Sequence, residues 1–312
     1  MTKQILSCDW GTTSFRLRLV NVHDGEILAE MNEGRGIAAV HNDWLQSNKP
    51  ENDRVSFYKI ILQSYIRKLH GGDLEGVPFI ISGMASSSIG IKELSYSKIP
   101  FDLSGDRLNV LKIVSDEECS HDILLVSGLK TNSDVMRGEE TMLVGCDFGD
   151  NVETLAIFPG THSKHALVKN KTLIDFKTYM TGEIFDLLAN RSILAKSVIK
   201  SEDEKFSGVF ETGLKEGAAG NLLNTSFHVR TNQLFKTLSP EENYQYLSGL
   251  VIGTELKEIS ATNVNIHLVC GQGLMERYRV ALQSLMANGK LQCHNADNAL
   301  IEGHCRLANH FL

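Results

Sequence analysis

The sequence lacks several features that mark whole classes of protein. It has no stretch approaching the roughly 20 apolar residues that span a bilayer, so we do not expect a membrane partner. It also has no run rich in Lys or Arg, and its formal net charge is -7. Nucleic acid is therefore not expected as the main partner, because phosphate backbones need a positive surface. A small basic pocket for an anion remains compatible with this charge.

Cysteine is present but unpatterned. The six cysteines are scattered with no Cys-x-x-Cys pair. This distribution is typical of reduced, buried thiols and disfavours a disulfide framework or a zinc site. The N-terminal apolar segment ends at Asp9, too early for the hydrophobic region of a signal peptide. We therefore expect a cytoplasmic protein.

The size of the chain predicts two domains. Its 312 residues exceed the length at which one hydrophobic core usually stops growing. The hydrophobic fraction of 42% provides enough apolar material for two cores. A cleft between two domains is a common place for a ligand, so we expect the site there.

The sequence contains two copies of one supersecondary unit. Each copy has three strands with a small, hydroxyl-rich first turn, and an Asp-Gly pair marks the second turn of the first copy. The turns are Gly11–Ser14 and Pro159–Ser163. The predicted strands are residues 5–9, 15–20 and 26–32 in the first copy, and 154–158, 165–168 and 172–179 in the second.

Strands and helices alternate after each of these units. Apolar spacing predicts helices over residues 57–69 and 242–256. Residues 138–145 and 296–303 resemble each other and read as helices that end near glycine. The pattern predicts two α/β domains with mixed sheets, residues 1–148 and 149–312.

The first turn has the composition of a phosphate site. Gly11, Thr12 and Thr13 combine an accessible backbone with hydroxyl donors, which suits an oxyanion. Asp9 stands at the preceding strand end, where it could hold Mg²⁺ through a water. An ordinary hairpin turn with a satisfied Asp is the alternative. Because Gly160 and Thr161 occupy the matching place in the second copy, we expect the two turns to grip β- and γ-phosphates from opposite sides.

These segments carry a family resemblance. Residues 9–16, Asp-Trp-Gly-Thr-Thr-Ser-Phe-Arg, resemble the first phosphate motif of actin/hexokinase-like kinases, and residues 159–164 resemble the second. Together with residues 135–141 and 179–183, they are similar to the segments that mark 2-dehydro-3-deoxygalactonokinases. The resemblance spans nearly the whole chain. The Arg-Gly-Glu-Glu-Thr and Pro-Gly-Thr-His segments are its most specific parts.

The resemblance implies a fold and an activity. The fold would be a pair of duplicated actin-like ATPase domains, ribonuclease H-like, with an interdomain cleft. The activity would be ATP- and Mg²⁺-dependent phosphorylation of 2-dehydro-3-deoxy-D-galactonate at its 6-hydroxyl, in galactonate catabolism. Gly271 and Gly273 would match the glycines against which adenosine lies, and Arg16 would contact the substrate. The oligomeric state is left open, and a homodimer is compatible with the sequence.

The general base has three candidates. Phosphoryl transfer leaves the protein mainly positioning and charge neutralisation, but a carboxylate near the attacking hydroxyl is usual. Asp134, Glu139 and Glu140 all lie at the junction that opens the helix closing the first domain. Many sugar kinases of the superfamily have an Asp at the start of such a helix, so the Glu pair is a departure. Adjacent helix positions do not share a face, so only one of the pair is expected to point into the cleft.

Several other side chains are expected to bind the substrate or the transferred phosphate. Arg137 suits a carboxylate because its guanidinium can bind both oxygens, and Lys164 is the second cation. Thr161 and His162 could donate to the γ-phosphate or to a sugar hydroxyl. A surface ion pair is the alternative for each cation, and a structural role is the alternative for His162.

Rival interpretations keep both Gly-Thr turns. A kinase for another sugar or sugar acid, or a phosphatase acting on polyphosphate, would differ mainly in residues 137–141. A non-catalytic actin-like assembly protein or a sugar-sensing regulator is the rival from another class. A regulator would usually bring a basic DNA-binding segment, and none is apparent.

Overall fold

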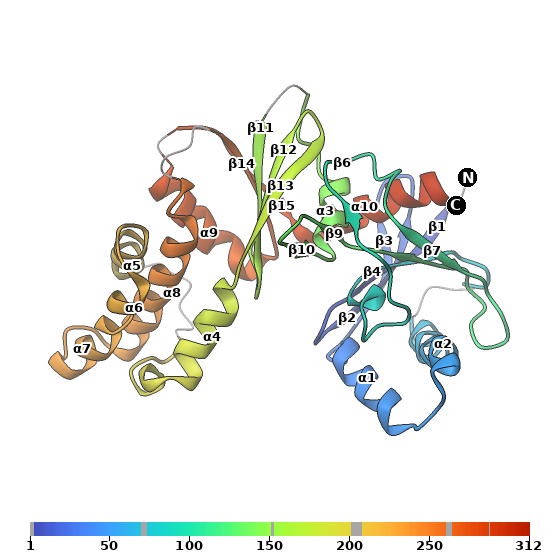
Figure 1. The fold of residues 1–312 in the computed structure, drawn as a ribbon, viewed down its shortest axis with the longest axis horizontal. Coiled ribbons are helices and arrows are strands. Elements are labelled where there is room, and N and C mark those ends of the chain that lie inside the picture. Colours follow the sequence, from blue (N-terminus) through green and yellow to red (C-terminus); the bar gives the residue numbers. More distant parts are fainter. Residues whose placement is uncertain (1–2, 70–73, 151–152, 201–207, 260–263, 287) are drawn as a thin grey trace. The chain divides into compact units, whose positions relative to one another are not determined.

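The chain folds into two compact units (Figure 1). Unit 1 comprises Met1–Asp150, Asn170–Asp175 and Ala296–Leu312, and unit 2 comprises Asn151–Lys169 and Phe176–Asn295. The computed structural model describes residues 3–69, 74–150, 153–200, 208–259, 264–286 and 288–312. Within these ranges, none of the helices combines the length and the apolar character that crossing a bilayer requires.

Unit 1 is built on a mixed six-stranded sheet. The strand order is β3-β2-β1-β4-β8-β7, in which β1, β4 and β8 are parallel and the remaining pairs are antiparallel. Three short strands form a second sheet in the order β10-β9-β5. The strands are β1 (Gln4–Trp10), β2 (Phe15–Asn21), β3 (Ile27–Glu33), β4 (Phe79–Gly83), β5 (Ser97–Lys98), β7 (Val110–Ile113), β8 (Ile123–Val126), β9 (Leu129–Lys130) and β10 (Val135–Met136).

Helices lie on both sides of the main sheet of unit 1. Figure 1 shows α1 and α2 on one side and α10, next to α3, on the other. The α-helices are α1 (Ile37–Gln46), α2 (Arg54–Ile66), α3 (Glu139–Gly145) and α10 (Ala296–Phe311). Two short 3-10 turns, η1 (Glu51–Asp53) and η2 (Met84–Ser86), precede α2 and follow β4.

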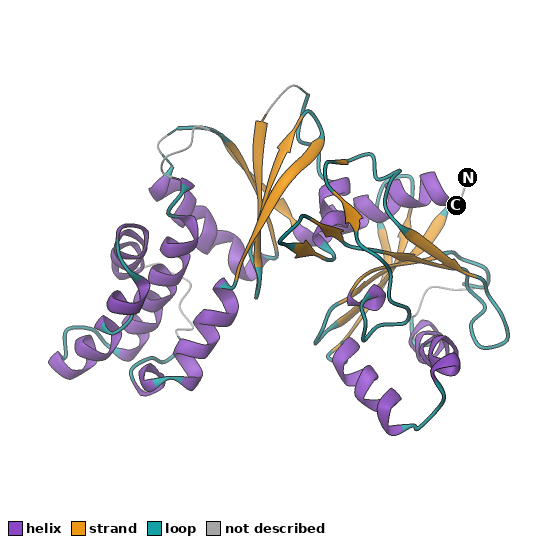
Figure 2. Ribbon diagram, viewed as in Figure 1, coloured by secondary structure: helices purple, strands orange, loops and turns teal. Residues whose placement is uncertain are grey.

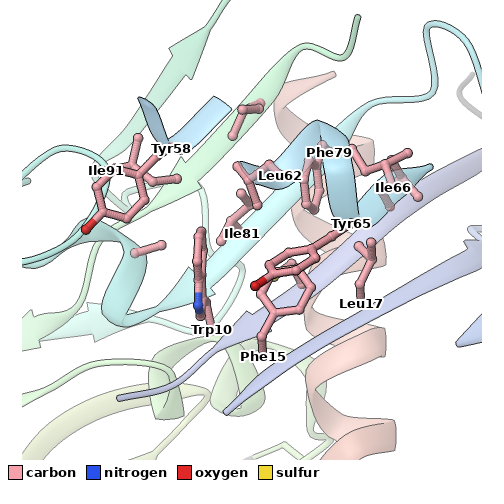
Figure 3. Packing of buried hydrophobic residues seen from close by; sticks show 14 of the residues in the cluster. Trp10, Phe15, Leu17, Tyr58, Leu62, Tyr65, Ile66, Phe79, Ile81 and Ile91 are labelled. Atoms are coloured by element: carbon pink, nitrogen blue, oxygen red, sulfur yellow. The ribbon is translucent and has the colours of Figure 1, made fainter. Parts of the chain in front are cut away.

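Successive side chains of β1 point to opposite faces of the sheet, one in the apolar core and the other toward α10. Leu6, Cys8 and Trp10 belong to the apolar cluster that β1 shares with α2 (Figure 3). Ser7 points the other way, and its hydroxyl lies 2.7 Å from Nδ1 of His304 in α10. Because side chains alternate along a strand, Asp9 shares the α10 side with Ser7.

A third sheet has the order β15-β14-β11-β12-β13-β6, and its strands from β15 to β12 belong to unit 2. Here β11, β14 and β15 are parallel, and β11 and β12 are antiparallel. Thr172 and Leu173 at the start of β13 belong to unit 1 and pair with β6 (Phe101–Asp102). The strands are β11 (Glu153–Phe158), β12 (Ser163–Lys169), β13 (Thr172–Tyr179), β14 (Asn265–Cys270) and β15 (Leu291–Asn295).

Helices α5, α8 and α9 share an apolar core with this sheet, and Figure 2 shows the helices of unit 2 gathered beside it. Helix α8 begins with a capping box between Ser239 and Glu242. It packs closely on α5, since a Cβ at Gly213 would lie 2.2 Å from the Tyr246 carbonyl oxygen. The helices are α4 (Thr181–Arg191), η3 (Ile193–Lys196), α5 (Gly208–Ala219), α6 (Leu222–Thr225), α7 (His228–Phe235), α8 (Pro240–Leu256) and α9 (Gln272–Leu285).

The predicted duplication is confirmed by the topology of the two sheets. The order β3-β2-β1-β4-β8 in the first half matches β13-β12-β11-β14-β15 in the second. In both sheets the first strand pairs antiparallel with the second and parallel with the fourth. The six predicted strands and the four predicted helices all form, most with ends shifted by a few residues. The prediction that the last helix ends near Gly303 is wrong, because α10 continues to Phe311. The fold is therefore a duplicated α/β architecture with mixed sheets, as expected.

The compact units differ from the expected division at residues 148/149, because Asn170–Asp175 and the segment that contains α10 belong to unit 1. Glycines allow α3 and α10 to approach backbone to backbone. A Cβ at Gly145 would lie 1.8 Å from the Ala299 carbonyl oxygen, and one at Gly303 would lie 2.0 Å from that of Thr141. This packing joins segments far apart in the sequence, so local patterns did not reveal it. The functional assignment of the two domains stays a prediction.

Candidate functional site

The first phosphate turn is a short, exposed loop between paired strand ends. Trp10 pairs with Phe15, and the Gly11 N–H donates to the Ser14 carbonyl over 2.9 Å. Trp10 is buried with its ring 5.1 Å from that of Phe15, which anchors both strand ends. Thr12, Thr13 and Ser14 are exposed. Their backbone N–H groups donate to no backbone acceptor in the part of the chain that the structure describes. The Thr13 and Ser14 nitrogens lie against Gly36, where an added Cβ would be 2.4 and 2.5 Å away.

The N-terminus of α1 holds this turn from behind. The Ile37 N–H donates to the Gly11 carbonyl over 3.0 Å, and the Ala38 N–H donates to that of Thr12 over 3.1 Å. A Cβ at Gly36 would lie 2.4 Å from the Thr12 carbonyl oxygen, so only glycine permits the contact. The helix thus fixes the carbonyl groups of the turn on one side.

The second turn is held in the same way by α4. The Gly182 N–H donates to the Gly160 carbonyl over 3.2 Å, and the Glu183 N–H donates to that of Thr161 over 3.1 Å. A Cβ at Gly182 would lie 2.7 Å from the Gly160 carbonyl oxygen. The duplication therefore extends from the sheets to the hydrogen bonds that shape both turns. The sequence pattern did not identify these supporting glycines, although Thr-Gly-Glu was among the family-like segments.

Asp9 lies where β1, β4 and the start of α3 meet. A Cβ at Gly83 would lie 3.3 Å from Asp9 Oδ1, and one at Gly138 would lie 3.7 Å from the Gly83 Cα. Both glycines have positive φ, 83° and 107°, which other residues adopt at a cost. Burial raises the pKa of Asp9; Arg16 and Arg18 oppose this shift and Asp297 adds to it. Asp9 is thus brought close to the segment that carries the candidate bases.

The two adjacent glutamates at the start of α3 have different environments. Glu140 is fully buried, and its Oε2 accepts from the Gly138 N–H over 2.6 Å. Burial raises the pKa of Glu140 to about 8, with the neighbouring charge of Glu139 as the second cause. Glu139 is half-buried and accepts from the Arg137 N–H over 3.0 Å. Only one of the pair therefore has a partly exposed side chain.

Arg137 is held in a defined orientation within unit 1. Its Nη1 donates to the Ser86 carbonyl over 2.7 Å and also to the Ser86 hydroxyl. Its guanidinium carbon lies 4.4 Å from the centre of the Tyr96 ring, a cation–π geometry. Nε and Nη2 have no acceptor among the residues that the structure describes. These two nitrogens form one edge of the guanidinium, which can bind a carboxylate.

Asp134 and Arg16 make local structural contacts. Asp134 shapes the turn between β9 and β10, where its Oδ1 accepts from the Val135 N–H over 2.8 Å. Arg16 donates to Asn32 over 3.0 Å and also pairs with Asp297 at the start of α10. These contacts lie within unit 1, and the proposed roles of both residues stay predictions.

Around the second turn, His162 and Lys164 both have partners. His162 Nε2 lies 2.6 Å from Glu183 Oε2, and both side chains are partly exposed. Lys164 is buried, and its Nζ donates to the His162 carbonyl over 3.0 Å. The ammonium group therefore lies against the turn itself, where it would add positive charge beside a bound anion.

Among the described residues, neither packing nor backbone conformation requires glycine at three positions that are expected to bind nucleotide. A Cβ at Gly160, Gly271 or Gly273 would meet nothing within 4 Å, and none of the three has a positive φ. Gly271 caps α9 and Gly273 lies in its first turn. Such bare backbone at a turn and at a helix N-terminus is suited to close approach by a ligand.

The proposed residues are divided between the units. Asp9, the first turn, Arg137 and the start of α3 belong to unit 1, whereas the second turn, Lys164 and the glycines of α9 belong to unit 2. No group of three or more His, Cys, Asp or Glu side chains with metal-ligand geometry occurs among the described residues.

Comparison with known proteins agrees with these features. A sequence profile of the 2-keto-3-deoxy-galactonokinase family matches residues 9–307. A probable 2-dehydro-3-deoxygalactonokinase of Rhizobium meliloti is 31% identical and aligns over 95% of this chain and 93% of its own. The 2-dehydro-3-deoxygalactonokinase of Escherichia coli is 28% identical over 91% of each chain.

A solved structure gives the same result in three dimensions. The crystal structure of a candidate 2-dehydro-3-deoxygalactonokinase from Sinorhizobium meliloti is 30% identical to this chain. It matches with a TM-score of 0.81 over 98% of this chain and 96% of its own. The chain therefore belongs to the 2-keto-3-deoxy-galactonokinase family.

Proposed function

We propose that this protein transfers the γ-phosphoryl group of ATP to the 6-hydroxyl of 2-dehydro-3-deoxy-D-galactonate. One observation carries the proposal within a chain of this family. In each Gly-Thr turn, two carbonyl groups accept from the N-terminus of the next helix, and the N–H groups of Thr12, Thr13 and Thr161 donate to no backbone acceptor among the described residues. Donors placed in advance of binding stabilise charge without further reorganisation. The two turns would grip the terminal phosphates of ATP.

Each unit supplies part of the nucleotide site in this proposal. In unit 1, Thr12 and Thr13 would donate to the phosphates. Gly11, whose N–H is bonded to the Ser14 carbonyl, would let the phosphates approach the backbone of the turn. In unit 2, Gly160 and Thr161 would do the same, with Lys164 adding charge. Gly271 and Gly273 would let adenosine approach the start of α9, because a Cβ added at either position would meet none of the described residues within 4 Å.

Asp9 fits a role in holding Mg²⁺. Mg²⁺ bound with nucleotides commonly uses one or two carboxylates together with phosphate oxygens and waters. The Asp9 carboxylate lies at a strand end, against the backbone of Gly83. The ion would supply charge neutralisation at the terminal phosphates. Asp9 itself would orient this assembly relative to the first turn.

Glu139 is the base that the geometry favours. A general base must reach the hydroxyl from which it removes the proton. Glu140 is fully buried and directed to the Gly138 N–H, whereas Glu139 is only half-buried. Glu139 would take the proton of the 6-hydroxyl, and Glu140 would support the start of α3.

Arg137 would bind the carboxylate of the sugar acid. Ser86 and Tyr96 fix its guanidinium, leaving the edge formed by Nε and Nη2 for two parallel hydrogen bonds. His162 and Arg16 would contact the substrate at its other groups. The cytoplasmic location and a homodimeric state remain predictions.

An ADP-release assay tests the proposed function. The purified chain would be given ATP, Mg²⁺ and, separately, a panel of 2-keto-3-deoxy sugar acids and simple hexoses. We expect ADP release with 2-dehydro-3-deoxy-D-galactonate to exceed that with any hexose, and mass spectrometry to locate the phosphate on the 6-hydroxyl. Preference for a different acid would reassign the substrate, and ATP hydrolysis without an acceptor would favour a phosphatase.

A further inference from the structure

A buried carboxylate in unit 2 is contacted by four polar side chains. Glu255 in α8 is 3% exposed. Its Oε1 lies 2.8 Å from the Ser163 hydroxyl and 2.9 Å from His165 Nε2, and its Oε2 accepts from the Tyr278 hydroxyl over 2.6 Å. The Thr181 side chain donates to the same carboxylate. Burial opposes the charge, but the hydrogen bonds lower the pKa of Glu255 from its usual value, so it is ionised at neutral pH.

The four donors come from the segments that surround the candidate nucleotide site. Ser163 ends the second turn, and His165 follows it in β12. Thr181 begins α4, whose next two N–H groups hold Gly160 and Thr161. Tyr278 lies in α9, the helix that begins beside Gly271. One carboxylate therefore connects the turn, its supporting helix and α9.

A charged hub of this kind fixes the positions of its donors. Hydrogen bonds to an ionised group are shorter and stronger than neutral ones. A buried donor that loses its acceptor is strongly disfavoured. Ser163 and Thr181 therefore cannot move independently while Glu255 is charged. Ser163 directly follows His162 in the second turn, and Thr181 directly precedes the two residues whose N–H groups hold that turn.

We infer that Glu255 is a positioning residue for the nucleotide. Glu255 keeps the second turn in the conformation that binding of the terminal phosphates requires, and it does not contact the phosphates itself. This inference rests on the assignment of that turn to phosphate under the proposed function. The direct binding groups are the turn and Lys164, and Glu255 acts through Ser163 and Thr181.

The test compares Glu255→Gln with the wild-type protein. Gln keeps the size of the side chain but removes the charge and one acceptor. We expect KM for ATP to rise by at least about tenfold, since bonds to a charged group are being lost. KM for the sugar acid should change by less than about twofold, because sugar binding is assigned mainly to unit 1. Calorimetry should show weaker ADP binding by a similar factor.

Two further variants keep the test decisive. Ser163→Ala removes one of the four donors to Glu255 and leaves the other three in place. This variant can therefore test the inference even if Glu255→Gln fails to fold. It should weaken ADP binding more than AMP binding, because AMP lacks the terminal phosphate that the turn would hold. Glu258→Gln is the matched control. Glu258 is an exposed acid just beyond the end of α8, paired with Lys177 over 3.0 Å, and its loss should leave both KM values unchanged.

The possible results separate this inference from the proposed function. If Glu255→Gln and Ser163→Ala lower the melting temperature but keep wild-type ADP affinity and KM for ATP, Glu255 is only structural and the inference fails. If the wild-type protein phosphorylates no sugar acid yet binds ADP in a Glu255-dependent way, the substrate assignment fails and the positioning role stands. If the wild-type protein does not bind ADP, both are overturned.

Discussion

At the scale of single residues, the glutamate pair shows how neighbours in sequence can have separate roles. Glu139 is half-buried, whereas Glu140 is enclosed and bonded to the Gly138 N–H. We predict that Glu139→Gln lowers kcat by about 10²- to 10⁴-fold, the usual contribution of a positioned base. Glu140→Gln should lower kcat by less than about tenfold. Two mild losses in steady-state kinetics would move the base to Asp134 or elsewhere.

The pH dependence of stability offers an independent check on Glu140. Its pKa of about 8 in the folded protein lies above the ordinary value of 4.5, so the folded state binds the extra proton. Between these values this group makes the free energy of unfolding fall as pH rises, by up to about 1.4 kcal/mol per pH unit. In Glu140→Gln this decline should be absent. Denaturant unfolding from pH 5 to pH 8 would show it, and equal slopes for both proteins would contradict the assignment.

Arg137 leads to a prediction about substrate specificity. Losing a bidentate contact to a carboxylate should raise KM for the sugar acid roughly 10- to 100-fold in Arg137→Ala. KM for ATP should change little. Ser86→Ala leaves the guanidinium in place but removes the hydroxyl that holds Nη1, so its effect should be smaller and in the same direction. Equal increases in both KM values would exclude a specific carboxylate contact.

At the scale of elements, the two turns show the difference between glycines needed for packing and glycines left open. A Cβ at Gly182 would lie 2.7 Å from the Gly160 carbonyl oxygen and 2.8 Å from the Thr161 Cα, whereas one at Gly160 would meet nothing. We predict that Gly182→Ala lowers the free energy of unfolding by about 1–3 kcal/mol. Gly160→Ala should keep or slightly raise stability while increasing KM for ATP.

The matched control for this pair is Gly208→Ala at the start of α5. A Cβ there would also meet nothing within 4 Å, and the site is outside the proposed nucleotide contacts. The melting temperature of Gly208→Ala should equal or slightly exceed that of the wild-type protein. Its KM for ATP should stay near the wild-type value. If Gly160→Ala behaves in the same way as this control, the open space beside Gly160 is not used by a nucleotide.

The strands and the duplication could be predicted because their signals are local. Alternating apolar residues and the Asp24-Gly25 turn mark the first hairpins, and the same order of elements returns in the second half. Helix α1 has no side-chain cap on its N-terminus, and its first N–H groups bond to the turn instead. No sequence pattern within residues 34–46 indicates that these N–H groups bond to the first phosphate turn. The sequence therefore predicted neither α1 nor the role of Gly36.

The candidate site shows the same limit. Gly11, Gly160 and the Glu pair were predicted as site residues from composition and family-like segments, and these assignments stay predictions. Glu255 was not, because its four donors come from three other elements far apart in the sequence. A single acid in an apolar helix gives no sign of the hydrogen bonds that it accepts. Such residues emerge only when the elements are packed.

At the scale of the whole molecule, α10 shows that the end of the chain completes the unit formed by its beginning. Gly303 lies against α3, where an added Cβ would be 2.0 Å from the Thr141 carbonyl oxygen. Because both groups are held by their helices, Gly303→Ala must separate α3 from α10. We expect the free energy of unfolding to fall by about 1–3 kcal/mol. Since α3 also carries Glu139, kcat should fall as well, with little change in KM for ATP.

The adjacent position on α10 provides the comparison that makes this prediction specific. Glu302 is exposed and pairs with Arg306 over 3.0 Å one turn later, so Glu302→Ala should change stability by only about 0.3–0.5 kcal/mol and leave kcat unchanged. Chemical denaturation and steady-state kinetics on both variants would measure the difference. If Gly303→Ala loses stability but keeps full kcat, the spacing of α3 and α10 supports the fold without setting the position of the base. If it loses neither, the two helices have room to move apart, and the close packing at Gly303 does not stabilise unit 1.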